Sequence, residues 1–239
     1  MKISVAAQWL WEVLFPTYCL GCRRPGQYFC ADCWQSLSSA PAFGSDSGPE
    51  WERVQIDARP VYLDSVIALA DYGTPLVRQA VHYFKYRFVL ALGQELMVAL
   101  VSRQPHCPWP GALLVPIPLH RKKLKRRGFN QAAILAQAVG LQWQLPVCTT
   151  ALYRCRQQVA QMTLNRQQRL ENIHNIFAVQ PGQLPAGGTI VLVDDVVTTG
   201  ATLNEAARVL KTAGARRVVA VVLAHEKTAL GNIEFKNIL

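Results

Sequence analysis

Residues 190–202 constrain the fold of this chain more than any other stretch of its sequence. Residues 190–193 are four branched or aliphatic residues in a row, which is typical of a strand buried in a parallel sheet. A helix-period pattern begins near Ala201. The polar residues between these two elements should therefore lie at the carboxyl end of a strand, which is where open α/β sheets bind ligands.

These polar residues have the chemistry that a phosphorylated sugar requires. Asp194 and Asp195 are adjacent acceptors, suited to the neighbouring hydroxyls of a ribose. Gly200 lets backbone N–H groups approach an anion, and the next helix adds the positive end of its dipole. Three threonines supply hydroxyl donors: Thr198, Thr199 and Thr202. An Asp-Asp turn followed by a Thr cap is the structural alternative, but the whole run fits a phosphate nest.

Four cysteines near the N-terminus form two C-x-x-C pairs, Cys19 with Cys22 and Cys30 with Cys33. Each pair can place two thiolates on one turn, and two turns supply the four ligands of a tetrahedral zinc. Disulfides are the alternative, but the chain has 7 cysteines, an odd number, and lacks a recognisable secretion signal. We expect a structural Zn²⁺ site, since four cysteines leave no ligand position for water.

A second polar region follows a short apolar strand expected at residues 112–115. Prolines in the sequence Pro116, Ile117, Pro118, Leu119 fix the turn after this strand. A basic run at residues 121–127 comes next, and then Asn130, which can cap a helix over residues 132–139. The basic run and the net charge of +10 suit a polyanionic partner, either a pyrophosphate or a nucleic-acid backbone.

These motifs together resemble a known family. Residues 191–202 look like the phosphoribosyl pyrophosphate (PRPP) motif of type I phosphoribosyltransferases, and the loop at residues 116–119 resembles their pyrophosphate-binding loop. With the cysteines and the basic run, the chain is similar to the ComF/GntX family of competence-associated proteins over residues 19–225.

The resemblance implies an α/β fold, a type I phosphoribosyltransferase-like parallel sheet flanked by helices, with a small N-terminal four-cysteine zinc finger. It implies that PRPP or a nucleotide binds with Mg²⁺ to Asp194, Asp195, Val196, Val197, Thr198, Thr199, Gly200, Ala201 and Thr202. The two acids would be the catalytic residues, because they would hold the ribose diol and favour a developing oxocarbenium ion. Pyrophosphate or another polyanion would contact Lys85, Pro116, Ile117, Pro118, Leu119, Arg121 and Arg127. The acceptor, a nitrogen nucleophile, is left open.

The rest of the sequence indicates how the chain is organised. We expect an amphipathic N-terminal helix before Phe15, and a linker at residues 38–60 that is rich in Ser, Gly and Pro. We place the domains at residues 1–58 and 59–239. The family's Q-x-x-L, R-x-x-N and F pattern recurs at Gln161, Leu164, Arg169, Asn172 and Phe177, where the resemblance implies an active-site flap and a polar helix is the alternative.

Two functions are compatible with the sequence. One is a phosphoribosyltransferase-like protein of DNA uptake or utilisation, which displaces pyrophosphate from PRPP. The other is a non-catalytic module that binds single-stranded DNA or uptake and recombination proteins, although Phe129 is the nearest aromatic to the basic run. Because neither a cleavable signal peptide nor a transmembrane segment is recognised, we expect a cytoplasmic protein.

Overall fold

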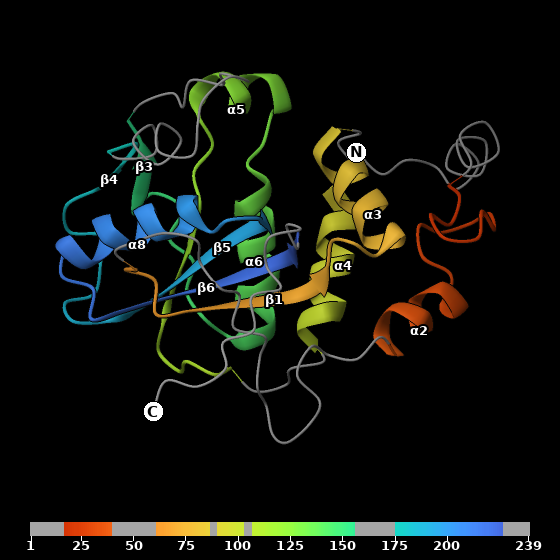
Figure 1. The fold of residues 1–239 in the computed structure, drawn as a ribbon, viewed down its shortest axis with the longest axis horizontal. Coiled ribbons are helices and arrows are strands. Elements are labelled where there is room, and N and C mark those ends of the chain that lie inside the picture. The colour runs from red at the N-terminus through yellow and green to blue at the C-terminus, as the bar shows by residue number, and fades with distance from the viewer. Residues whose placement is uncertain (1–16, 40–60, 87–89, 103–106, 156–174, 227–239) are drawn as a thin grey trace, which may run out of the picture.

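The computed structural model describes residues 17–39, 61–86, 90–102, 107–155 and 175–226. Its centre is a four-stranded sheet in the order β1-β6-β5-β2, and all neighbouring strands are parallel. These strands are β1 (Ser65–Asp71), β2 (Leu113–Pro116), β5 (Thr189–Val197) and β6 (Arg217–His225) (Figure 1). The predicted parallel sheet is confirmed, and β5 and β6 are its two inner strands.

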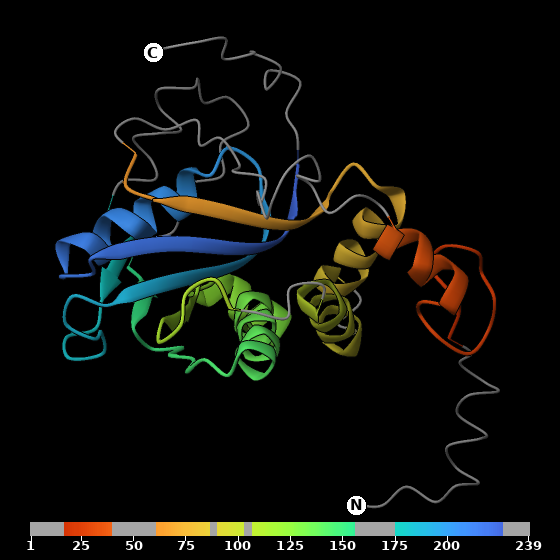
Figure 2. The ribbon, with the colours of Figure 1, turned by 90° about the horizontal axis from the view of Figure 1, so that it is seen from below.

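Apolar helices cover the sheet because every strand is hydrophobic on both faces. Helices α3 (Pro75–Tyr86), α4 (Leu90–Ser102) and α6 (Gln131–Trp143) bury one set of side chains with the sheet. Helix α8 (Ala201–Thr212) buries the other set through Leu203, Ala206, Ala207 and Leu210. Helices α4 and α6 lie side by side in Figure 2.

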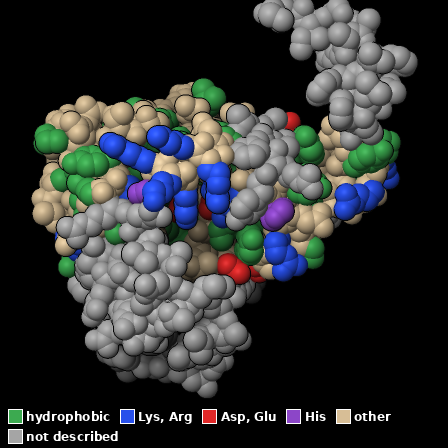
Figure 3. All heavy atoms as spheres, turned by 90° about the horizontal axis from the view of Figure 1, so that it is seen from above, with side chains coloured by type: hydrophobic (Ala, Val, Ile, Leu, Met, Phe, Trp, Pro, Cys, Tyr) green, Lys and Arg blue, Asp and Glu red, His purple; other side chains and the backbone are tan. Residues whose placement is uncertain are grey.

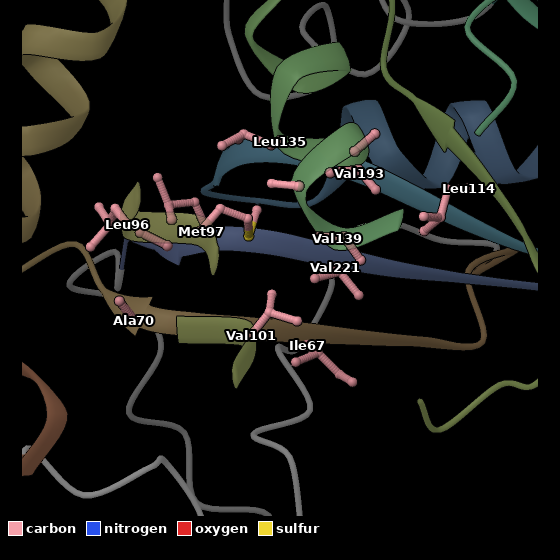
Figure 4. Close-up of a cluster of buried hydrophobic side chains, with 14 of the residues drawn as sticks. Ile67, Ala70, Leu96, Met97, Val101, Leu114, Leu135, Val139, Val193 and Val221 are labelled. Atoms are coloured by element: carbon pink, nitrogen blue, oxygen red, sulfur yellow. The ribbon is translucent and has the colours of Figure 1, made fainter. Parts of the chain in front are cut away.

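The first of these clusters is dense and dry. Leu96 and Met97 of α4 and Leu135 of α6 meet Val193 of β5 and Val221 of β6 there, all with at most 1% of their surface exposed (Figure 4). Large-to-small substitutions in such a core typically cost about 2–5 kcal/mol. The cluster therefore holds β5, and the polar residues at its end, in a fixed position.

Four small elements complete the described part of the fold. Strands β3 (Leu152–Arg154) and β4 (Phe177–Val179) form an antiparallel pair that packs with α8. Helix α2 (Ala31–Ser39) begins directly after Cys30, contains Cys33 and lies beyond α3 in Figure 2. A further short helix, α5 (Arg121–Arg127), lies above the sheet in Figure 1.

Several predictions fall outside the described residues. They are the N-terminal helix, most of the linker with the boundary between residues 58 and 59, and the pattern from Gln161 to Asn172. Helix α2 takes in residues 38 and 39, so the predicted linker began two residues too early. No helix in the described part of the chain is both long and apolar enough to cross a membrane.

Candidate functional site

Strand β5 carries the two acids at its carboxyl end. The strand runs to Val197, four residues farther than the apolar run predicted, so Asp194 and Asp195 lie inside it. Val193 packs in the cluster under α4 and α6, and regular alternation would place Val197 there too. Val197 instead lies in the opposite cluster, while Val196 packs against the first. The alternation therefore slips by one residue across the acidic pair.

Backbone hydrogen bonds hold both carboxylates. The Asp195 N–H donates to Asp194 Oδ1 at 2.9 Å, and the Val196 N–H donates to Asp195 Oδ1 at 2.7 Å. Each acid thus accepts a hydrogen bond from the residue that follows it. These two hydrogen bonds come from the strand's own backbone.

Lys85, in the last turn of α3, pairs with the second acid. Its Nζ lies 3.0 Å from Asp195 Oδ1, and the two side chains are only 22% and 13% exposed. The sequence predicted Lys85 as an anion contact, and the structure places it beside the predicted ribose site. A charged pair this sheltered interacts more strongly than a pair on the surface.

Asp194 is in a different electrostatic environment. Burial and the neighbouring charge of Asp195 raise the pKa of Asp194 to about 7, although the Asp195 N–H, Lys85 and Arg154 act in the opposite direction. Two adjacent carboxylates cannot ionise independently in a partly dry site. A bound cation, or hydroxyl donors from a ligand, would favour the ionised form.

The predicted phosphate loop connects β5 to α8. Gly200 has a φ of 73°, a left-handed conformation that side chains disfavour, and it comes directly before Ala201, the first residue of α8. Thr198 and Thr199 are exposed, and Thr199 Oγ1 accepts from the Ala201 N–H at 3.4 Å. The positive end of the 12-residue helix therefore faces a loop with exposed hydroxyls.

The second predicted loop lies beside the first. The Ile117 N–H donates to the Val193 carbonyl of β5 at 2.9 Å, so the chain after β2 stays against the strand that bears the acids. Asn130 caps α6 as predicted, because its Oδ1 accepts from the Ala132 N–H at 3.2 Å. Its Nδ2 also donates to the Ile117 carbonyl at 3.0 Å, which ties the loop to α6. The predicted contacts Pro116, Ile117, Pro118 and Leu119 are buried or half-buried.

The basic run forms helix α5, which the sequence reading did not predict. His120 Nδ1 accepts from the Lys122 N–H, and Gly128 ends the helix at a φ of 76°. Lys123 and Arg127, four residues apart, lie on one side of the helix, and helical geometry places Arg121 on the other. Lys123 is exposed, and desolvation together with the charges of Arg154, Arg127, Arg126 and Lys85 lowers its pKa. Lys and Arg side chains gather on this face of the molecule in Figure 3, around an acidic side chain.

Arg154 is a residue of this site that sequence reasoning missed. It ends β3, and its guanidinium carbon lies 5.5 Å from the centre of the Phe177 ring. Burial lowers the pKa of Arg154, while the charge of Asp194 acts to raise it, which places the two charges near each other. No spacing in the sequence could reveal a contact between residues 40 positions apart.

The four predicted cysteines come together in space. Their Sγ atoms all lie within 4.8 Å of one another, and those of Cys22 and Cys30 are 3.4 Å apart. All four are free thiols, and a tetrahedral zinc needs sulfurs about 3.8 Å apart, given Zn–S bonds of about 2.3 Å. A Cβ at Gly21 would lie 2.6 Å from Cys33 Sγ, so the turn requires glycine there. The cluster can hold one metal ion, and the donor set fits zinc.

The protonation of the cluster favours a cation. Burial opposes ionisation of Cys19, but backbone N–H groups of Cys22, Cys30 and Gly21 outweigh it and lower its pKa to about 6. The hydrogen bond that the protonated Cys33 thiol donates to Cys30, together with desolvation, raises the pKa of Cys33 to about 12. One thiol ionises readily while another resists, as expected where thiolates lie close together without a positive charge between them.

Comparison with known proteins agrees with this architecture. The sequence model of the phosphoribosyl transferase domain matches residues 124–237. The chain is 35% identical to competence protein ComFC of Streptococcus pneumoniae, over 91% of this chain and 97% of the relative. It is 31% identical to the DNA utilization protein YhgH of Salmonella typhi, over 85% of this chain and 94% of the relative. Competence protein F of Haemophilus influenzae is 28% identical over 85% of this chain and 82% of the relative.

The relatives cover 85–91% of the chain, and the domain match includes the acidic pair. The chain therefore belongs to the ComF family, whose members carry a phosphoribosyltransferase-like domain.

Proposed function

We propose that this protein binds PRPP with Mg²⁺ at the carboxyl edge of its sheet and acts in DNA uptake or utilisation. The observation that carries the proposal is the acidic pair of β5, which is paired with Lys85 and followed by the loop to α8. Two carboxylates that can bind a diol and a helix N-terminus that can bind a phosphate lie within nine residues, 194–202, at one strand end. Packing alone does not require this combination.

The ligand would be divided between the two loops. Asp194 and Asp195 would accept hydrogen bonds from the ribose hydroxyls, and residues 196–202 would bind the 5-phosphate. Residues 116–119, with Lys85 and Arg127, would contact the pyrophosphate. Arg121 is exposed whereas Arg127 is half-buried, so the predicted pyrophosphate contact of Arg121 is the less supported of the two. Mg²⁺ would arrive with PRPP and neutralise the leaving group.

Transferase chemistry at this site would use the same residues. A nitrogen nucleophile would form a bond to C1 of the ribose as the bond from C1 to the pyrophosphate oxygen breaks, and the electron pair would leave with pyrophosphate. The acids would favour the positive charge that grows on the sugar, and the cations would favour the charge that grows on the leaving group. The proposed acceptor of the phosphoribosyl group is therefore a nitrogen nucleophile.

We further propose that Cys19, Cys22, Cys30 and Cys33 bind structural Zn²⁺. The distances among the four sulfurs, the turn at Gly21 and the lowered pKa of Cys19 support this. A site with four cysteine ligands has no open position for a substrate. Its role would be to fold the N-terminal module.

The role in DNA uptake or utilisation is proposed from the relatives named competence proteins or DNA utilization proteins. A second candidate function, the binding of single-stranded DNA, is favoured by the outer side of α5. Arg121, Lys122 and Lys125 are exposed there, and Leu124 has 40% of its surface exposed. Phe129 is not a stacking platform, because it packs against Phe84 with the ring centres 6.0 Å apart. The cationic helix α5 is the observation that supports this second candidate. We also propose that the protein is cytoplasmic.

The proposal is tested by calorimetric titration of the zinc-loaded protein with PRPP, ribose 5-phosphate and pyrophosphate, with and without Mg²⁺. We expect one PRPP per chain, tighter binding with Mg²⁺, and displacement of PRPP by each of its two fragments. If ribose 5-phosphate did not displace PRPP, residues 194–202 would not be the binding site of the ribose 5-phosphate part.

A further inference from the structure

We infer that a metal ion in the cysteine cluster controls how tightly the acidic site binds PRPP, because helix α3 connects the two sites. This inference rests on the proposed binding of PRPP and of Zn²⁺, and it adds a means of regulation to the first. Helix α3 lies between the cysteine module (residues 17–35) and the sheet in Figures 1 and 2. It contacts the module at its start and carries Lys85 in its last turn.

The cysteine module has little apolar core of its own. Among residues 17–35, whose burial the structure describes throughout, only Cys19, Leu20 and Cys30 are buried. Two of these three are candidate metal ligands, so the interior of the module is largely the cluster itself. Folding of such a small module is coupled to binding of its metal. Loss of the metal would therefore release Leu20 from its place.

The module contacts α3 where that helix begins. A Cβ at Gly21 would lie 3.6 Å from Cδ1 of Leu76, the second residue of α3. Leu20 is 4% exposed and belongs to the same buried cluster as Val77 and Val81 of α3. The turn between the first two cysteines thus packs on the first half of the helix.

The other end of α3 contacts the strand that bears the acids. Lys85 Nζ lies 3.0 Å from Asp195 Oδ1, and both side chains are sheltered from solvent. An ion pair needs its partners at this separation, because the attraction weakens as the distance grows. The position of α3 therefore determines whether Lys85 holds Asp195 in its present place.

The same end of α3 also reaches the second loop of the proposed site. The Phe84 ring packs against Phe129, with the ring centres 6.0 Å apart. Phe129 comes directly before Asn130, whose Nδ2 donates to the Ile117 carbonyl at 3.0 Å. A shift of α3 would thus reach the loop at residues 116–119 as well as the acidic pair.

Helix α3 is packed tightly enough to transmit a displacement along its length. Val77, Val81 and Phe84 lie on one face of the helix, and each is at most 1% exposed. A Cβ at Gly93 of α4 would lie 2.5 Å from the Phe84 ring, so no free space separates the two helices there. Close-packed interiors are barely compressible and transmit strain. A change at the start of α3 therefore affects the position of its last turn.

This coupling has to be reciprocal. If zinc tightens PRPP binding by some factor, PRPP must tighten zinc binding by the same factor. Couplings between two sites on one protein typically amount to about fivefold to 150-fold, and we expect about fivefold to twentyfold here. A zinc ion that only folded its own module would give a factor of one.

Two titrations of the full chain test the inference. Calorimetry measures the affinity for Mg²⁺-PRPP with zinc bound and after a chelator has removed it. Competition with a chromogenic chelator measures the affinity for zinc with and without PRPP. We expect zinc removal to weaken PRPP binding about fivefold to twentyfold, and PRPP to lower the Kd for zinc by the same factor.

Leu20→Ala separates the coupling from metal binding itself. This variant keeps all four cysteines and should bind one zinc, but it loses most of the apolar contact with α3. Zinc-loaded Leu20→Ala should bind PRPP several-fold more weakly than zinc-loaded wild type. Val101→Ala is the matched control, because it removes two methyl groups from the same buried cluster on α4. It should keep the wild-type coupling factor even though its stability falls.

The Asp194→Asn, Asp195→Asn double variant controls for direct binding of zinc by PRPP. It lacks the proposed ribose contacts, so PRPP should leave its zinc affinity unchanged.

Equal PRPP affinity of the folded protein with and without zinc would overturn the inference and leave the proposed PRPP site standing. If the zinc-free chain does not fold, zinc-loaded Leu20→Ala decides, and wild-type PRPP affinity in that variant would overturn the inference. A wild type that binds zinc but no PRPP would remove the proposed function, and one that binds PRPP but no zinc would remove the zinc site. The inference would fall with either.

Discussion

Asp194 and Asp195 are neighbours in the sequence, yet the structure gives them different partners. Asp195 pairs with Lys85 of α3, while Asp194 is sheltered near Arg154 of β3. The slip in side-chain alternation across the pair lets one strand present carboxylates to cations from two elements. This asymmetry has a measurable consequence for stability.

We predict that Asp194→Asn makes the unliganded protein more stable at pH 8 and changes it little at pH 4. The native Asp194 keeps its proton up to a pKa of about 7, whereas the unfolded chain releases it at about 3.8. Between these values the native state binds more protons, so wild-type stability falls as pH rises from about 4 to about 7. Asparagine removes this loss, worth on the order of 4 kcal/mol, and keeps the oxygen that accepts from the Asp195 N–H.

Urea unfolding at several pH values checks this prediction. Asp64→Asn is the control, because Asp64 pairs with Lys211 at 2.8 Å and accepts from the Val218 N–H at 2.7 Å. That variant should lose stability at every pH. An Asp194→Asn variant with the same pH dependence as wild type would show that the acid is not held protonated.

Single residues were predictable where one short segment contains the chemistry. The acidic pair, the threonine loop and the four cysteines were all found from local spacing, and Lys85 from the family resemblance. Arg154 was not, because the ring that its guanidinium covers, Phe177, is distant in the chain. Its position depends on the pairing of β3 with β4, which no local pattern encodes.

Among the elements, helix α5 departs most from the sequence reading. Seven mostly cationic residues repel one another and were expected as a solvated run, yet caps at His120 and Gly128 enclose a helix. Gly128 could have indicated from the sequence where α5 ends. Strand β5 also ran past its apolar residues, since its acids are satisfied by backbone N–H groups and by Lys85.

The two sides of α5 predict separable effects on nucleic-acid binding. Replacing Lys122 and Lys125 by Ala should weaken binding of a short single-stranded oligonucleotide and reduce the slope of log K against log salt by about 1.4. Each lost phosphate contact on a single strand accounts for about 0.7 of that slope. PRPP affinity should not change, because both residues lie away from the acidic pair.

Fluorescence titrations at four salt concentrations measure this slope. Ala substitutions at Lys211 and Arg24, which are basic residues on other parts of the surface, provide a control of equal charge. An unchanged slope in the Lys122 and Lys125 variant would place the nucleic-acid surface elsewhere.

In the molecule as a whole, the cysteine module is packed against the main core. Leu20, between two of the cysteines, is buried with Val77 and Val81 of α3, and Phe29 and Trp34 pack against the same cluster. Helix α3 thus contacts the cysteine module at one end and carries Lys85 at the other. Helix α3 therefore links the fold of the cysteine module to the geometry of the acidic site.

We predict that the purified protein contains about one equivalent of zinc and that Cys30→Ser loses it, since metal binding and folding are coupled in such modules. The unfolding midpoint should fall, because Leu20 would lose its fixed place in the core. Cys148→Ser, a half-buried cysteine outside the cluster, should keep the metal. Zinc analysis and thermal unfolding decide this, and a folded, metal-free wild type with disulfides among these cysteines would refute it.

The central claim is that the acidic pair of β5 binds the ribose of PRPP. Calorimetric titration of Mg²⁺-PRPP into the Asp194→Asn, Asp195→Asn double variant tests it most directly. Asparagine keeps the oxygens that accept from the Asp195 and Val196 N–H groups, so the fold should survive. We expect binding to fall by at least about a hundredfold, since each lost charged hydrogen bond costs about 1.5–3 kcal/mol. A folded double variant that binds PRPP as tightly as wild type would contradict the assignment of this site.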